Sequence, residues 1–165
     1  MKFCKVRDVK SPVRGTEKAA GIDFFIPNSF NDSAPYRLNP HCDALIPTGI
    51  KMEIPENYML MAADKSGVVT TYTAAFRAGR TPKKEAFSSS VIIGAKIVDE
   101  DYQGEIHIHL INIGDSPVYL RPGMKIAQFI LIPVSYEKLE EVSRSEIFSQ
   151  TSERGSGAFG STGSY

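Results

Sequence analysis

The residues from Arg154 to Gly163 carry groups that bind phosphate: one guanidinium, several hydroxyls and several glycines. Glycines let successive backbone amides turn toward one anion, and arginine adds a two-pronged, charge-assisted contact. Phe159 has no apolar neighbour nearby in sequence, so its flat face is free to stack on a nucleobase. Residues 149–165 contain no valine, leucine or isoleucine and are expected to form a flexible tail. Taken alone, this segment is equally compatible with a solvated linker.

A second candidate is the acidic segment from Asp99 to Tyr102. An antiparallel hairpin that turns at Asp101 and Tyr102 has two expected pairs, Val98 with Glu105 and Lys96 with His107. Asp99 then lies near the loop, beside a cleft, where a carboxylate can orient and deprotonate a water molecule. The alternative is that Asp99 and Asp101 are ordinary turn acids.

These two segments belong to a set of five that resembles the five ordered motifs of the homotrimeric dUTPase family (deoxyuridine triphosphate pyrophosphatases). The order and the approximate spacing both match, and the resemblance spans nearly the whole chain. The segments are Ala20–Asp23, Pro47–Ile50 with Lys65–Gly67, Val98–Gly104, Gly123–Gln128 and Arg154–Gly163.

The resemblance implies hydrolysis of dUTP to dUMP and pyrophosphate, which limits uracil incorporation into DNA and supplies dUMP for dTMP synthesis. Asp99 would be the catalytic residue that activates the water attacking the α-phosphorus. Tyr102 would lie beneath the deoxyribose and exclude a ribose 2′-hydroxyl. Uracil would lie between the hairpin arms and be read largely by main-chain groups of Lys96, Ile97, Val98 and His107.

The same resemblance implies a set of phosphate contacts. The expected substrate-binding residues are Lys65, Ser66, Gly67, Gln128, Arg154, Gly160, Ser161 and Thr162, with Phe159 covering the uracil. Lys65 departs from the usual arginine of the family and lacks its planar fork, and Ala158 replaces a common glycine. Asp23 is a supporting residue beside Lys65 and the water shell of the metal, although a turn-capping aspartate is an alternative.

The resemblance also implies a cofactor and an assembly. Mg²⁺ would be held by the phosphates and by waters, with no direct protein ligand. Three identical chains would share three active sites, and the glycine-rich tail would complete the site of a neighbour.

Two other functions stay open at this point. One is a dCTP deaminase of the same fold, against which Lys65 and Asp99 argue. The other is a nucleotide-gated regulatory module that binds a partner protein. Residues 70–90 read as a basic loop inserted between strands, and their cations could attract the triphosphate or an acidic protein. A solvated surface loop is the simpler interpretation.

The composition limits these choices further. The chain has 165 residues, 42% of them hydrophobic, which suits one compact domain. Nineteen basic and nineteen acidic residues cancel, so no positive field is available for a nucleic acid partner. Cys4 and Cys42 form no paired motif, and no apolar run of about 18 residues is present. We therefore expect no membrane association and no secretion, and a cytoplasmic or otherwise intracellular, reducing compartment.

Periodicity predicts the elements that must position these residues. Even positions are apolar or Thr from Ile46 to Ile54, and the alternation returns from Glu105 to Leu110. The almost wholly apolar run Lys125–Ile132 predicts a central strand, and Tyr136–Val142 predicts one short helix. The expected fold is an all-β, dUTPase-like β-barrel or jelly-roll (β-clip) subunit over residues 1–148, with a flexible C-terminal arm over 149–165.

Overall fold

The computed structural model describes residues 1–65 and 91–157 of the chain. Two compact units are present, Met1–Ser135 and Tyr136–Tyr165. The expected boundary between residues 148 and 149 lies within the second unit.

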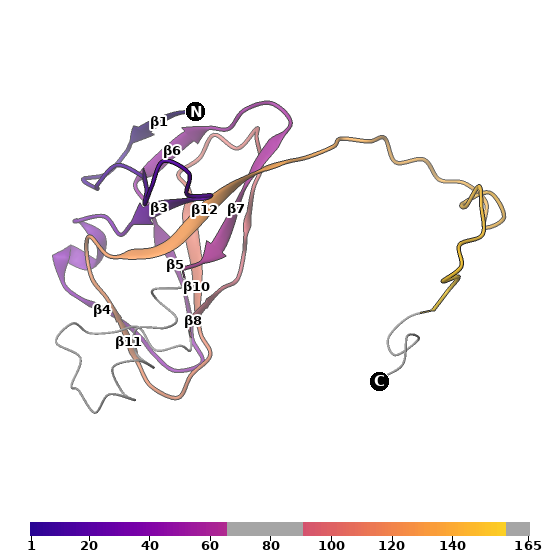
Figure 1. Ribbon diagram of the computed structural model, residues 1–165. Coiled ribbons are helices and arrows are strands. Elements are labelled where there is room, and N and C mark those ends of the chain that lie inside the picture. Colours follow the sequence, from indigo (N-terminus) through magenta and orange to yellow (C-terminus); the bar gives the residue numbers. More distant parts are fainter. Residues whose placement is uncertain (66–90, 158–165) are drawn as a thin grey trace. The chain divides into compact units, whose positions relative to one another are not determined.

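The first unit consists almost entirely of short strands (Figure 1). The strands are β1 (Lys2–Lys5), β2 (Val13–Arg14), β3 (Gly21–Phe25), β4 (Tyr36–Leu38), β5 (Asp43–Pro47), β6 (Ile50–Glu53), β7 (Tyr58–Asp64), β8 (Val91–Ile93), β9 (Ile97–Val98), β10 (His107–Asn112), β11 (Val118–Leu120) and β12 (Lys125–Pro133). All their pairings are antiparallel. The prediction of an all-β fold is confirmed.

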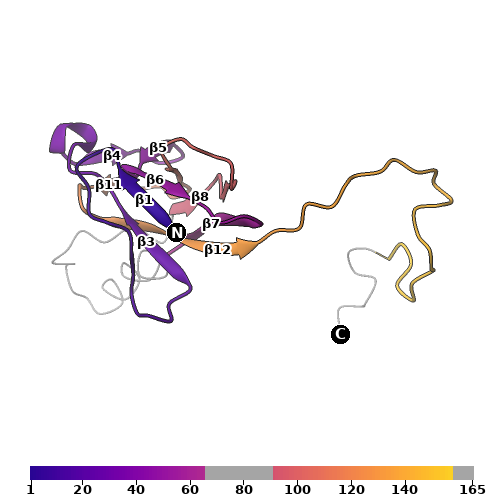
Figure 2. The same cartoon turned by 90° about the horizontal axis from the view of Figure 1, so that it is seen from above.

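The largest sheet has the order β2-β3-β12-β7-β9. Its middle strand, β12, pairs with β3 on one side and with β7 on the other, and Figure 2 shows the same strand from above. Phe129 of β12 is fully buried and packs against Phe24 of β3, with ring centroids 4.5 Å apart. The predicted central strand is therefore confirmed: Ile126, Ala127 and Phe129 are buried, and Ile130, Leu131 and Ile132 are half-buried.

A second sheet has the order β5-β10-β8. Ile106, Ile108 and Leu110 are buried, as the alternation predicts, and so are all the even positions from Ile46 to Ile54. The latter run forms two strands rather than one, because the chain turns at Gly49, which has a φ of 71°. Thus β5 joins β10, whereas β6 pairs with β1.

Helix is nearly absent from the described residues. The predicted helix at Tyr136–Val142 is wrong, since this segment has no regular structure. Its Leu139 is fully exposed, so no apolar face is buried to stabilise a short helix that is marginal by itself. One short 3-10 helix lies instead at Phe30–Ser33. No helix of the described part of the chain is long and apolar enough to cross a membrane.

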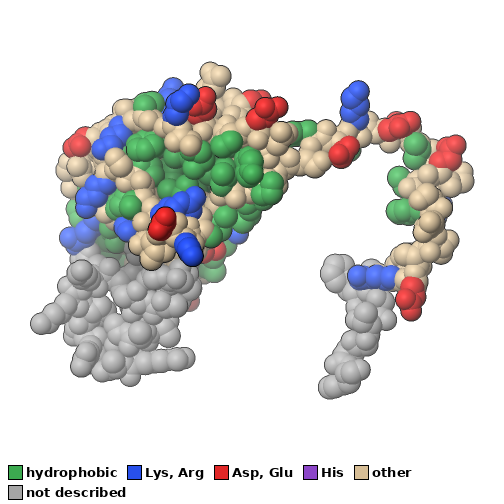
Figure 3. Space-filling view, turned by 45° about the horizontal axis from the view of Figure 1, so that its top comes forward, with side chains coloured by type: hydrophobic (Ala, Val, Ile, Leu, Met, Phe, Trp, Pro, Cys, Tyr) green, Lys and Arg blue, Asp and Glu red, His purple; other side chains and the backbone are tan. Residues whose placement is uncertain are grey.

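The buried hydrophobic core lies between the sheets of the first unit. Some apolar side chains remain outside it, among them Leu45 and Ile92, which are 62% and 38% exposed. Both lie on the outer face of the β5-β10-β8 sheet, since Leu45 pairs with His109 and Ile92 with Ile111. Figure 3 shows that hydrophobic side chains gather on one face of this unit. A patch of this kind is typical of an interaction surface.

Candidate active site

The predicted hairpin forms only at its base. β8 pairs with β10 in the predicted register, with Ile93 opposite Leu110, and Gly94 N donates to His109 O at 2.9 Å. Beyond this point the expected pairs, Val98 with Glu105 and Lys96 with His107, are not formed. The prediction of a continuous two-stranded hairpin is therefore wrong at its tip.

The incoming arm of the hairpin is bonded to a different strand. β9 pairs with β7, with Val98 opposite Leu60, and Ala62 N donates to Lys96 O at 2.7 Å. This pairing draws the incoming arm into the five-stranded sheet.

The outgoing arm is bonded to the turn between β5 and β6. Ile106 N donates to Ile50 O at 2.9 Å, and Ile106 O accepts hydrogen bonds from Thr48 N at 3.1 Å and from Thr48 Oγ1 at 2.7 Å. Within the described residues, no backbone hydrogen bond joins residues 95–98 to 105–107. Two separate frameworks therefore hold the arms apart and leave main-chain groups available to a planar ligand.

The turn of the hairpin presents an exposed carboxylate. Asp99 is exposed, and its carbonyl accepts a hydrogen bond from Tyr102 N at 3.2 Å. The Tyr102 hydroxyl donates to Glu105 O at 2.9 Å. The Tyr102 ring lies over Gly104, where a Cβ would overlap its hydroxyl end, so only glycine leaves room for this ring position.

A second group of residues lies where β3, β12 and the end of β7 meet. Asp23 is 4% exposed, and its Oδ1 lies 2.7 Å from Lys65 Nζ while its Oδ2 lies 2.8 Å from Lys125 Nζ. Burial alone would raise the pKa of Asp23, but hydrogen bonds from Lys125 and Lys65, with their positive charges, hold that pKa below its usual value. Asp23 is thus an ionised anchor for two cations.

Gln128 belongs to the same group, because it pairs with Asp23 across β3 and β12. Its Nε2 donates to Asp64 O at 3.1 Å. A Cβ at Gly21 would overlap the Gln128 amide, so this glycine is required by a close approach. Sequence reasoning did not select Lys125 as a site residue, although its place in the fourth motif, three residues before Gln128, was a usable signal.

Several predicted site residues cannot be placed. Ser66, Gly67, Phe159, Gly160, Ser161 and Thr162 lie outside the described residues, as do Ala158 and the 70–90 segment. Arg154 lies in the second unit, where its Nε donates to Gly157 O at 2.9 Å. The structure therefore brings together Asp23, Lys65 and Gln128 in one group and the hairpin residues in another.

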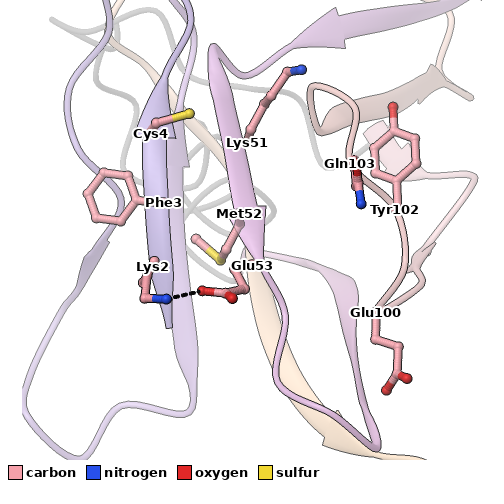
Figure 4. Close-up of a pocket in the computed structure, with 9 residues that line it drawn as sticks. All are labelled: Lys2, Phe3, Cys4, Lys51, Met52, Glu53, Glu100, Tyr102 and Gln103. Atoms are coloured by element: carbon pink, nitrogen blue, oxygen red, sulfur yellow. Dashed lines mark ion pairs between the residues drawn. The ribbon is translucent and has the colours of Figure 1, made fainter.

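A cavity of about 450 Å³ borders the hairpin tip. Figure 4 shows Tyr102 and Gln103 on one side of it and the paired strands β1 and β6 on the other, with Lys2 and Glu53 in an ion pair of 3.0 Å. The remaining lining residues are Phe3, Cys4, Lys51, Met52 and Glu100. Because neither Asp99 nor any residue of the Asp23 group lines it, we do not assign it as the nucleotide site.

The part of the chain that the structure describes contains no group of three His, Cys, Asp or Glu residues that could hold a metal ion. Both carboxylate oxygens of Asp23 are occupied by lysines. The Asp23 carboxylate is therefore not a free metal ligand, and a magnesium ion would have to be held through the phosphates of a ligand.

Known proteins share this architecture. The deoxyuridine 5′-triphosphate nucleotidohydrolase of Chlamydia pneumoniae is 40% identical over 152 residues, which are 92% of this chain and 90% of that protein. A structure of the dUTPase of Staphylococcus bacteriophage 80alpha with dUPNHPP superposes with a TM-score of 0.74 at 23% identity, covering 98% of this chain and 97% of that one.

A mutant dUTPase from phage phi11 of S. aureus, described with a structural Mg(II) ion, has a TM-score of 0.63 at 20% identity and covers 86% of this chain and 95% of that one. These two structures support the fold. The family model for dUTPase matches residues 7–163. Together with the identity to the chlamydial protein, this match shows that the chain belongs to the dUTPase family.

Proposed function

We propose that this protein is a dUTP diphosphatase, a nucleotide pyrophosphohydrolase that releases dUMP and pyrophosphate from dUTP. The observation that carries the proposal is the hairpin whose arms are held apart, with Asp99 exposed at its turn. Main-chain groups of Lys96, Ile97, Val98 and His107 would read the uracil edge between the arms. In the cell this reaction would limit uracil in DNA and supply dUMP for dTMP synthesis.

The chemistry needs little covalent participation by the protein. Asp99 would accept a proton from the water that attacks the α-phosphorus, and the bridging bond to the pyrophosphate would break in line. Lys65, Lys125 and Gln128 would stabilise the phosphate charge from the other side. Bound Mg²⁺ would supply further neutralisation of that charge.

The geometry of one chain favours a site shared between subunits. Val98, next to Asp99, lies opposite Leu60 of β7, whereas Lys65 follows the far end of the same strand. Five residues of strand span about 16 Å, so within one chain Asp99 and Lys65 lie at opposite ends of β7 rather than side by side. A homotrimer resolves this separation, because the Asp23 group and Asp99 would then come from different subunits. The tail would contribute Arg154, Phe159, Gly160, Ser161 and Thr162.

Pyrophosphate release from dUTP, dCTP, dTTP and UTP, each with Mg²⁺, tests the proposal. We expect turnover of dUTP alone. Release of ammonia from dCTP without turnover of dUTP would favour the deaminase, which the nucleotidohydrolase relatives do not support.

Asp99→Asn sharpens the same test, because it removes the base and keeps the shape of the side chain. We expect nucleotide binding within a few-fold of the wild type and a loss of turnover of at least about 100-fold, the lower range for general-base catalysis. Near-normal turnover would remove Asp99 from its proposed role.

Two further expectations stay predictions. Cys4 and Cys42 are exposed free thiols, which is compatible with the proposed reducing, intracellular compartment. A regulatory partner for residues 70–90 remains a proposal, and deletion of this segment with unchanged kinetics and partner binding would contradict it.

A further inference from the structure

An arginine near the N-terminus is bound to the far end of the hairpin. Arg7 Nε lies 2.7 Å from Glu105 Oε1, and its Nη2 lies 3.0 Å from Glu105 Oε2. The two residues are separated by 98 positions in the sequence. This fork-on-carboxylate geometry fixes both the distance and the orientation of the pair.

Glu105 is held from a third direction as well. Gly49 N donates to Glu105 Oε1 at 2.8 Å, and Gly49 O accepts from Val6 N at 2.8 Å. Val9, which is 4% exposed, packs on the same glycine. The N-terminal segment, the β5–β6 turn and the outgoing arm therefore form one bonded unit around the Glu105 carboxylate.

The backbone carbonyl of Glu105 accepts hydrogen bonds from two residues that are proposed to face the substrate. Glu105 O accepts the Tyr102 hydroxyl at 2.9 Å and His107 Nδ1 at 2.8 Å. A shift of the Glu105 carbonyl would move both hydrogen bonds together. Tyr102 is otherwise 45% exposed, so few contacts besides this bond and Gly104 fix its ring.

We propose that Arg7 is a positioning residue that sets the discrimination between deoxyribose and ribose by fixing Glu105, and through its carbonyl the ring of Tyr102. The proposal rests on the function proposed above and on the place beneath the sugar that the family resemblance implies for Tyr102. Arg7 touches no reacting atom. Its effect is on which sugar is accepted rather than on the chemical step.

The test compares kcat/KM for dUTP and for UTP in the full-length protein and in Arg7→Ala. We expect kcat for dUTP within a few-fold of the wild type and a loss of the dUTP preference of about tenfold, because displacements of about 1 Å at a site can cost up to 100-fold in rate. Arg7→Lys keeps the charge but not the fork, so an intermediate preference is expected.

A matched control and a second measurement separate the possible outcomes. Arg37→Ala removes an exposed arginine from β4, and its sugar preference should equal that of the wild type. Binding of the α,β-imido analogues of dUTP and UTP measures the preference without turnover. If Arg7→Ala does not fold, Arg7→Lys and Glu105→Gln are measured in its place.

Each result counts for or against the inference. A lowered preference in the Arg7 variants but not in Arg37→Ala supports it. A lower melting temperature with an unchanged preference overturns it, since Arg7 would then only stabilise the fold. A wild-type protein that does not turn over dUTP would instead contradict the proposed function. A wild-type protein that binds the dUTP and UTP analogues equally would also overturn the inference about Arg7.

Discussion

Two carboxylates in this molecule are each held by cations, but by different kinds. Asp23, a buried residue of β3 opposite Gln128 of β12, receives one contact from each of two lysines, Lys65 and Lys125. Glu105, at the end of the hairpin, receives a two-pronged contact from Arg7 and a hydrogen bond from the backbone amide of Gly49.

The scaffold thus has an adaptable side, around Asp23, and a rigid side, around Glu105. A lysine ammonium is a point charge on a flexible stem, so Lys65 and Lys125 can turn toward an arriving phosphate while Asp23 stays in place. The guanidinium of Arg7 has a fixed planar fork, which matches only one arrangement of the Glu105 carboxylate. The first region suits a mobile, charged ligand, and the second suits a fixed geometry for base and sugar.

The largest expected effect follows from Asp23→Asn. Two lysines then lose their ionised partner, and we expect the free energy of unfolding to fall by about 2 kcal/mol, less than the 3–5 kcal/mol of a fully buried pair because both ammonium groups can reach solvent. Urea unfolding measures this change. Glu105→Gln should lower the free energy of unfolding by only about 1 kcal/mol, since Arg7 is partly exposed. A larger loss in Glu105→Gln than in Asp23→Asn would contradict this comparison of the two carboxylates.

Thr48→Val tests the hydrogen bond that attaches the outgoing arm of the hairpin to the turn between β5 and β6. The substitution keeps the shape of the side chain but removes the hydrogen bond from Oγ1 to Ile106 O. Because the site is buried, we expect a loss of about 1–2 kcal/mol in the free energy of unfolding. Thr48→Ser, which keeps the hydroxyl but loses the methyl group, is the control; a loss in Thr48→Ser with none in Thr48→Val would indicate that packing of the methyl group is responsible.

Gly21→Ala tests the position of the Gln128 side chain beside Asp23. The added Cβ must displace the flexible amide end of Gln128, so we expect a roughly tenfold loss of turnover, about 1.4 kcal/mol in transition-state stabilisation. The stability should change little, because the displaced group can rotate into solvent. Gly15→Ala, where an added Cβ meets nothing within 4 Å, should leave turnover unchanged.

The smallest effect is a difference in acid stability. The pKa of Asp23 lies below its unfolded value despite the opposing effect of burial, because Lys125 and Lys65 favour the charged form. Its stabilisation is therefore fully present above the unfolded pKa of about 4 and is lost as the pH falls through the folded pKa. Asp23→Asn should unfold with a shallower dependence on pH below about 4 than the wild type. Identical acid limbs in urea titrations would refute this assignment.

Much of the fold could be predicted from the sequence because strand periodicity is a local property. The inward positions of Ile46, Ile106 and Ile108 follow from alternation, and the central place of β12 follows from its continuous apolar run. The family followed from five ordered motifs. The helix prediction at Tyr136–Val142 failed because local propensity alone does not stabilise a short helix without a packing partner.

The candidate site was predictable in part. Asp23 and Lys65 do meet, in agreement with the resemblance, while the expected pairs at the hairpin tip do not form. Arg7 was missed because it stands out neither by spacing nor by composition, whereas Lys125 was missed although it lies in the fourth motif.

The sequence alone was enough to identify which residues face inward and which family the chain belongs to, and to propose where the catalytic turn lies. Only the tertiary structure decided which strands compete for the two hairpin arms, and that Arg7 meets Glu105 across 98 positions. The physical reason is that alternation and turn chemistry act between near neighbours in the chain. Backbone pairing and ion pairs between distant segments depend instead on which surfaces the folded chain brings together.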